Sequence, residues 1–141
     1  MLRCVLDTDV VISAMRSAEG ASAAILLAAL ERRVMLLGSV PLVLEYEAKC
    51  LEFRHYSEAE LSQQEAEAFV NAVIDLIEPV HMDFHWRPQV HDPADEMVLE
   101  TAINGQADLL VTFNLRDYGD APKRFGIEAM RPSEAIWRIR S

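Results

Sequence analysis

The sequence predicts an α/β protein, a three-layer α/β/α sandwich around a mostly parallel central sheet. Short apolar runs typical of buried strands alternate with longer stretches of helical periodicity over the whole chain. The first run, Val5-Leu6, leads directly into an acid, Asp7. In open parallel sheets, ligands bind in the crevice beyond the carboxyl ends of the strands. Asp7 is therefore the expected anchor of a functional site.

Length and composition describe one globular domain spanning residues 1–141. Hydrophobic residues make up 51% and charged residues 26% of the chain, and no apolar run approaches the roughly 20 residues of a membrane helix. Cys4 and Cys50 lie in apolar stretches and are expected to be buried free thiols, which fits a cytoplasmic protein. The net charge of −10 excludes a generally phosphate-binding surface. Any nucleic-acid role must depend on a local site.

The chain begins with an expected strand over 2–6, followed by a turn into a helix. The next helix is expected over 21–33, because its apolar residues recur at helical spacing and its last residues are cations, which suit a helix C-terminus. A short strand over 34–37 follows and ends at Gly38. Alternation of this kind is the pattern of a parallel sheet covered by helices.

Two further helices are expected in the middle of the chain. Ser39 followed by Pro41 indicates the start of one. Ser57 and Glu60 have the spacing of a capping box, which predicts a second helix over 57–77.

The last part of the chain returns to alternating strands and helices. A short strand is expected over 80–86, and a helix that opens at Asp92 is expected to end at Gly105. The remaining expected elements are strands over 107–111 and 127–130 and a terminal helix over 132–140.

Several acids and one amide lie at predicted strand ends or on predicted helices: Asp7, Glu45, Asp92, Asp95, Asn114 and Asp117. Carboxylates gathered in one crevice repel by roughly 4 kcal/mol per close pair at an effective dielectric of about 20. Such a group persists only when a proton or a cation offsets the charge. Mg²⁺ and Mn²⁺ prefer oxygen ligands, so the pattern predicts a divalent site suited to activating water against a phosphodiester.

Some of these acids also have purely structural interpretations. Asp7 and Asp9 suit the capping of the turn that follows the first strand. Glu45 is spaced to pair with Lys49 one helical turn later, and Asp117 suits a turn.

Asp92, placed before Pro93, has the position of an N-cap, and Asp95 lies in the first turn, where negative charge is favourable. Since capping needs only some of these acids, Asp95 remains free to face the crevice. The hydroxyls of Ser13 and Thr112 are expected to orient a carboxylate or a bound water, because no histidine is placed to activate either as a nucleophile.

Other functional patterns are weaker. His81, His85 and His91 lack the cysteines and regular spacing of a zinc site, and no glycine-rich phosphate loop is present. Residues 55–86 contain no Lys or Arg but many acids. This acidic stretch is either a solvated helix surface or a dock for a basic partner.

Taken together, these motifs resemble those of PIN-domain ribonucleases, the fold of VapC-type toxins in bacterial toxin–antitoxin pairs. Residues 5–14 (VLDTDVVISA) resemble the first family motif, 44–47 (LEYE) the second and 92–95 (DPAD) the third. Residues 107–114 (ADLLVTFN) resemble the fourth, which 116–118 (RDY) continue. The resemblance covers almost the whole chain.

The resemblance implies a three-layer α/β fold, one or two bound Mg²⁺ or Mn²⁺ ions, and hydrolysis of single-stranded RNA. Asp7, Glu45 and Asp95 match the family's acidic triad. It is closest to the toxin subgroup, which implies a cognate antitoxin as partner; a homo-oligomer is expected as well.

Two positions depart from the family pattern. Where many members have Asn after the first Asp-Thr pair, this chain has Asp9, which adds a charge. At the fourth acidic position it has Asn114. Two expectations follow: either Asp117 substitutes as the metal ligand, or the fourth ligand position is weak.

The resulting hypothesis is a Mg²⁺- or Mn²⁺-dependent endoribonuclease. Asp7 and Asp95 are expected to bind the ion and Glu45 to complete the site, while Asn114, Thr112 and Ser13 position the water and the carboxylates. The cations expected to contact the RNA backbone, unless they are only solvated loop charges, are Arg16, Arg116, Lys123 and Arg124.

Two alternatives belong to other functional classes. The start of the chain also fits a haloacid-dehalogenase-like phosphatase with Asp7 as the phosphorylated nucleophile, although no later paired-acid motif follows a strand. The second alternative is a catalytically weak binding module that works through its acidic helix.

Overall fold

The computed structural model describes residues 1–85 and 88–141. Its strands are β1 (Arg3–Leu6), β2 (Met35–Gly38), β3 (Ile77–Pro79), β4 (Leu109–Val111) and β5 (Glu128–Met130). Its helices are α1 (Thr8–Arg16), α2 (Ala21–Leu30), α3 (Val40–Cys50), α4 (Phe53–Glu58), α5 (Gln63–Asp75), α6 (Pro93–Asn104), α7 (Leu115–Tyr118), α8 (Ala121–Arg124) and α9 (Pro132–Arg140).

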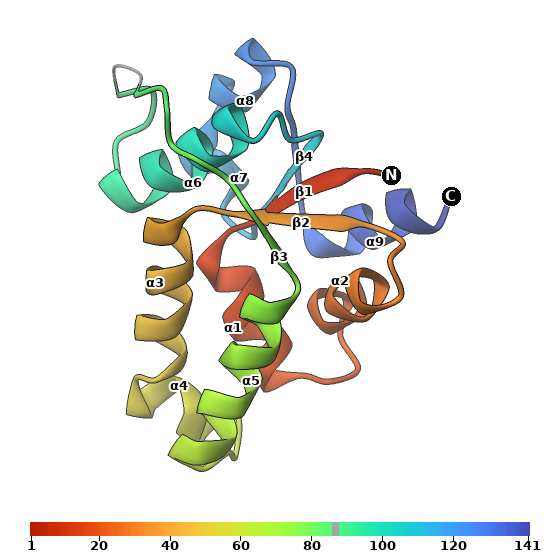
Figure 1. Ribbon diagram of the computed structural model, residues 1–141, viewed down its shortest axis with the longest axis vertical. Helices are drawn as coiled ribbons and strands as arrows, with labels where there is room; N and C mark the ends of the chain where they lie inside the picture. The colour runs from red at the N-terminus through yellow and green to blue at the C-terminus, as the bar shows by residue number, and fades with distance from the viewer. Residues whose placement is uncertain (86–87) are drawn as a thin grey trace.

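The described strands form one sheet in the order β3-β2-β1-β4-β5, and every neighbouring pair is parallel. Helices cover both faces of it (Figure 1). On one side α6 packs against β1, β2 and β4. On the other side lie α1, α2, α3, α5 and α9, which contact one another in a chain of neighbours. The predicted α/β/α sandwich is confirmed.

The strand order reverses beside β1. The chain first builds outward from β1 through β2 to β3, and then crosses to β4 and β5 on the other side of β1. Leu6 and Val111 are partners in the β1–β4 register, and the Asp7 N–H donates to the Val111 carbonyl at 2.9 Å. Asp7 and Thr112 therefore follow adjacent strands at the point where open parallel sheets bind ligands.

The core is made largely by the strands and by the inner faces of the helices. β4 is buried at all three positions, and β1 is buried from Cys4 onward. The buried apolar side chains of the described residues form one cluster, which also contains Cys4 and Cys50 as free thiols. The expectation for both cysteines is confirmed.

The helix expected over 21–33 is three residues too long. α2 ends at Leu30, Arg32 adopts a left-handed conformation with φ of 59°, and the Arg33 N–H returns to the Ala28 carbonyl at 2.8 Å. This closure is the Schellman arrangement, which usually places glycine at the left-handed position. Because Arg32 stands where glycine is usual, the residue pattern does not mark the helix end.

The single helix expected over 57–77 is wrong, and so is its capping box. Glu60 has φ of 59°, and the Leu61 N–H bonds the Tyr56 carbonyl at 2.9 Å, which ends α4 in the same way. The capping box lies five residues later, between Ser62 and Glu65, and starts α5. Both pairs have the same spacing, and the break at Glu60 decides between them.

The strand expected over 80–86 is also wrong over the residues that the structure describes. The strand lies earlier, as β3, and residues 80–85 are irregular; Trp86 is outside the described residues. The α6 boundaries are as expected, although Gly105 has an ordinary φ of −82° and the left-handed residue is Gln106. A Cβ on Gly105 would lie only 2.9 Å from Val80, so this glycine serves close packing.

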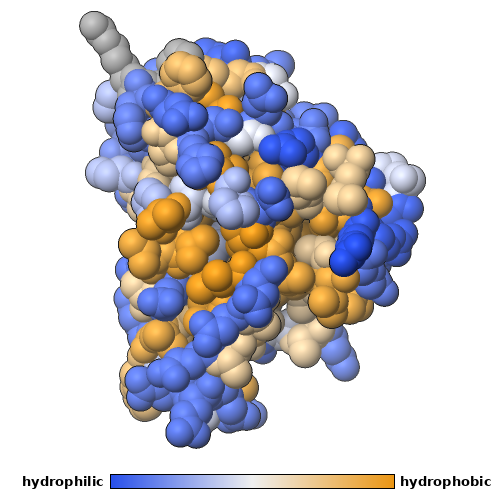
Figure 2. Space-filling model, viewed as in Figure 1, coloured by the Kyte–Doolittle hydropathy of each residue, from blue (hydrophilic) through white to orange (hydrophobic). Residues whose placement is uncertain are grey.

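One part of the surface is notably apolar. Figure 2 shows apolar side chains gathering between α3 and β3, where Val40 and Leu44 are 73% and 57% exposed. A hollow of about 210 Å³ on this surface is lined by Val40, Val43, Leu44, Ile74, Ile77 and Pro79. In the described parts of the chain, no single helix is long and apolar enough to cross a membrane; α1 and α2 reach that length only as a pair bent by 97°.

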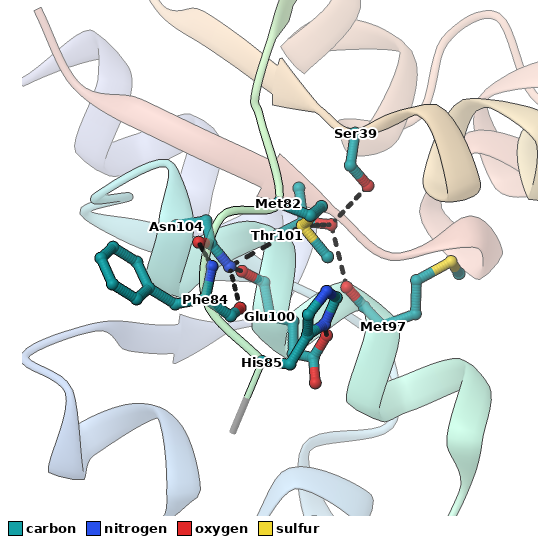
Figure 3. Close-up of polar contacts among 8 residues, drawn as sticks. All are labelled: Ser39, Met82, Phe84, His85, Met97, Glu100, Thr101 and Asn104. Carbon is teal, nitrogen blue, oxygen red and sulfur yellow. Dashed lines mark hydrogen bonds and ion pairs between the residues drawn. The ribbon is translucent and has the colours of Figure 1, made fainter. Parts of the chain in front are cut away.

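A buried chain of hydroxyls joins α3 to α6 across the sheet edge (Figure 3). Ser39 caps α3 by accepting from the Leu42 N–H at 3.4 Å. Thr101 donates to the Met97 carbonyl at 2.9 Å, so its oxygen accepts from Ser39 at 2.7 Å. This network fixes the start of α3, which carries Glu45, against the helix that carries Asp95.

We expect Ser39→Ala to lower the free energy of unfolding by about 1–2 kcal/mol, since it removes a cap and a buried hydrogen bond. In a double-mutant cycle with Thr101→Val, measured by urea unfolding, the coupling should be about 1 kcal/mol. Additive effects of the two substitutions would contradict the network.

Candidate metal centre at the ends of β1 and β4

Asp7 is the buried acid of the site, with 7% of its surface exposed. Its Oδ1 accepts from the Thr8 N–H at 2.7 Å and so caps α1. Its Oδ2 accepts from the hydroxyl of Thr112 at 2.9 Å and from that of Tyr118 at 3.0 Å. The proposed capping role is therefore correct, but it uses only one of the two carboxylate oxygens.

Tyr118 is a site residue that sequence reasoning missed. Its ring is buried, and its hydroxyl offsets part of the rise in the pKa of Asp95 that burial and neighbouring acids cause. The Tyr118 hydroxyl therefore lies near both Asp7 and Asp95. The sequence offered a weak signal, since Tyr118 ends the RDY segment, but nothing there showed that the ring points inward.

Asp9 is held by the segment that follows β4 instead of acting as a helix cap. Its Oδ2 accepts from the Phe113 N–H and from the Asn114 side-chain amide, both at 3.1 Å. The Asn114 N–H in turn donates to the Thr112 hydroxyl oxygen at 3.0 Å. The start of α1 is therefore joined to the turn after β4 through side chains of both predicted motifs.

In the part of the chain that the structure describes, Asp7, Asp9 and Asp95 form no ion pair with a protein cation. Burial, followed by the charge of Asp7, raises the pKa of Asp9 from 3.8 to about 7. The same two causes, in the same order, raise the pKa of Asp95 from 3.8 to about 6. These shifts show that Asp7, Asp9 and Asp95 lie within electrostatic range of one another, although they come from β1, α1 and α6.

Asp95 is positioned by the way α6 begins. Asp92 caps the helix through the Ala94 N–H at 2.8 Å, as predicted, and Pro93 occupies the first turn. Glu96 does not face the crevice; its Oε2 accepts from the Gln89 and Val90 N–H groups at 2.8 and 3.1 Å. Capping and loop anchoring use these two acids and leave Asp95 for the site.

The segment before α6 is fastened along that helix (Figure 3). The Asn104 side chain accepts from the Phe84 N–H and donates to the Phe84 carbonyl, each at 2.9 Å. His85 bonds Glu100 at 3.2 Å one turn earlier. These contacts give His85 a structural partner and hold α6 in place over the sheet.

Glu45 is the third acid of the predicted triad, and it comes from α3. Glu45 is half-buried on α3, and no hydrogen bond or ion pair joins it to another described residue; Lys49 pairs with Glu52 instead, at 3.4 Å. Its neighbour Tyr46 donates to the Leu6 carbonyl, directly before Asp7. The predicted contribution of Glu45 to the site therefore stays a prediction.

The cations expected at the RNA are distributed unevenly. Arg16 forms an ion pair with Glu58, and Arg124 donates to the Gln89 side chain at 3.2 Å. Arg116 and Lys123 are exposed on α7 and α8.

A hollow of about 380 Å³ beside Asp9 is lined by Asp9, Ile12, Ser13, Arg16, Ser17 and Phe113. Ser13 therefore shares this hollow with Asp9. A larger one, about 450 Å³, lies around Trp137 and contains none of the predicted site residues. The volume of a hollow therefore does not identify the candidate site. The group of carboxylates at Asp7, Asp9 and Asp95 is the feature that identifies it.

A family model described as "PIN domain" matches residues 3–116. The chain belongs to the PIN-domain family. Comparison with curated proteins finds no match. The matched region contains all four acidic motifs up to Asn114 and ends before Asp117 and Tyr118. PIN domains are typically nucleases and generally use divalent metal ions.

The carboxylate side chains of this PIN domain are of the kind that binds a divalent metal ion. Within residues 1–85 and 88–141, no three His, Cys, Asp or Glu side chains are already arranged around a metal position. Mg²⁺, however, is usually held by one or two carboxylates together with water. In the same described residues, the buried Asp9 Oδ1 has no hydrogen-bond partner, which leaves a hard oxygen ligand available beside two further carboxylates.

We expect Tyr118→Phe to lower the free energy of unfolding of the PIN domain by about 1.5–3 kcal/mol, because Asp7 is a buried charged acceptor. Tyr46→Phe is the matched control, since its hydroxyl donates to a neutral carbonyl, and should cost about 1 kcal/mol. Chemical denaturation measures both. A smaller loss for Tyr118→Phe than for the control would contradict a charge-assisted bond to Asp7.

Proposed function

We propose that this PIN domain is a Mg²⁺- or Mn²⁺-dependent endoribonuclease that cleaves single-stranded RNA in the cytoplasm. The observation that carries the proposal is the group formed by Asp7, Asp9 and Asp95, in which burial and then the charge of Asp7 raise the pKa of Asp9 and Asp95. None of the three forms an ion pair with a protein cation among the described residues. A divalent ion is the natural counter-charge, and the family match supports nuclease chemistry.

A bound divalent ion lowers the pKa of a water molecule and offsets charge that develops on the phosphate. Asp7 and Asp95 are the residues proposed to hold it, with Glu45 completing the site. Thr112 and Tyr118 keep the Asp7 carboxylate in one orientation, which leaves less reorganisation for the reaction itself.

The substrate is proposed to lie across the exposed side of the carboxylate group. Arg116 on α7 and Lys123 on α8 are free to reach an RNA backbone, and the hollow beside Asp9 extends the surface toward Arg16. Since the net charge is −10, the metal and these few cations must supply the attraction for phosphate.

The phosphatase alternative is not favoured. In that mechanism Asp7 attacks a phosphoryl group. The chain instead matches the PIN-domain family, whose members are typically nucleases, and no later paired-acid motif follows a strand. The binding-module alternative differs in one measurable property, because a degenerate site would bind no stoichiometric Mn²⁺.

A cognate antitoxin is proposed as the protein partner, through a basic segment that contacts either the carboxylate crevice or the acidic surface of α4 and α5. That acidic surface consists of Glu58, Glu60, Glu65 and Glu67. Two of its members have structural roles, Glu58 with Arg16 and Glu65 in the capping box. Homo-oligomerisation also stays a prediction, and the apolar surface between α3 and β3 has the composition that such an interface needs.

We expect Asp7→Asn and Asp95→Asn each to reduce cleavage of a fluorescent single-stranded RNA with Mn²⁺ by more than about a hundredfold, since each removes a proposed ligand. Glu45→Gln should reduce it as well. The matched control is Asp75→Asn, which neutralises an exposed acid at the end of α5 and should leave the rate unchanged. Wild-type rates in both Asp7 and Asp95 variants would refute the metal site.

The acidic surface is tested by replacing its four glutamates with Gln, which preserves the α5 capping geometry. If the antitoxin binds there, its affinity should fall by at least about tenfold, because several charge contacts are lost together. The antitoxin to use is the product of a neighbouring small open reading frame with a basic tail. Unchanged affinity would exclude this surface and leave the crevice.

A further inference from the structure

Asp9 carries a charge that the predicted triad does not use. Its Oδ2 is fixed by the Phe113 N–H and the Asn114 amide, each at 3.1 Å. Its Oδ1 is buried and has no hydrogen-bond partner in the part of the chain that the structure describes. A buried carboxylate oxygen without a donor costs free energy unless a cation contacts it.

The Asn114 side chain shows how that oxygen is aimed. Its amide nitrogen donates to one Asp9 oxygen, so the carboxylate is held from the β4 side while the other oxygen stays free. The two side chains are joined by one hydrogen bond; Asp9 lies in the first turn of α1 and Asn114 in the turn after β4. A carboxylate at either position, with an amide at the other, would bring its negative charge to almost the same place.

Asp9 and Asp117 are thus competing candidates for the fourth acid. The charges of both Asp7 and Asp95 act on Asp9. Asp117 is exposed on α7, and its charge acts on Asp95. Asp117 also has no neighbouring side chain that holds its carboxylate, as judged from the hydrogen bonds among the described residues. Asp9 is favoured because it lies near both Asp7 and Asp95 and because hydrogen bonds hold its carboxylate in place.

We propose that Asp9 supplies the fourth carboxylate of the divalent-ion site through its free Oδ1, with Asn114 as the positioning residue that holds it. The family pattern places the fourth carboxylate at position 114. In this chain, position 114 is an asparagine, and the carboxylate is supplied by Asp9, to which Asn114 is hydrogen-bonded. This inference rests on the proposed function and deepens it, because it names a ligand that the acidic triad lacks.

The test is calorimetric Mn²⁺ binding to the metal-free full chain, with no RNA present. Asp9→Asn should weaken binding by at least about tenfold. Asparagine can still accept from the Phe113 N–H, so this variant should stay folded, which near-UV circular dichroism checks. The exchange variant, Asp9→Asn with Asn114→Asp, should bind within about threefold of wild type, because it restores the charge.

Asp117→Asn separates the two candidates and should also bind within about threefold of wild type. Equal binding by wild type and Asp9→Asn would overturn the inference while leaving the proposed function intact. The inference would also be overturned if Asp117→Asn lost Mn²⁺ affinity, or if the exchange variant bound Mn²⁺ no better than Asp9→Asn. Absence of Mn²⁺ binding by the wild-type chain would overturn the proposed function and this inference with it.

Discussion

Because Asp7 is buried, its carboxylate must be hydrogen-bonded, and its donors come from three separate parts of the chain: the start of α1, the turn after β4 and the short helix α7. This requirement joins the two central strands at the switch point of the sheet. It also explains why Thr112 and Tyr118 are buried polar groups next to an otherwise apolar core. The functional end of the molecule is organised by satisfying one acid.

The hydrogen-bonded carboxylate of Asp7 adds to the negative charge around Asp9 and Asp95. Asp7 is close enough to raise the pKa of both Asp9 and Asp95, and the described residues provide no cation among them. Such repulsion is tolerated where a ligand supplies the missing charge. The same arrangement would allow a strongly acidic protein to act on RNA as proposed, since a bound divalent ion reverses the local sign of the potential.

Sequence patterns predicted the fold class, most element positions and the Asp92 cap, because these depend on periodicity and on local hydrogen bonding. They failed at helix ends where Arg32 and Glu60 take the left-handed conformation usually given to glycine. They also missed Tyr118 and the Asp9–Asn114 pair. Those contacts join residues more than 100 positions apart, and only the packing of β4 beside β1 brings them together.

The claim that carboxylates from distant segments share one divalent ion is tested most directly by anomalous diffraction from Mn²⁺-soaked crystals of the full chain. The account predicts a manganese peak between the ends of β1 and β4, with oxygens of Asp7 and Asp95 within about 2.0–2.6 Å. A peak at other residues, or no peak at concentrations that support cleavage, would contradict it.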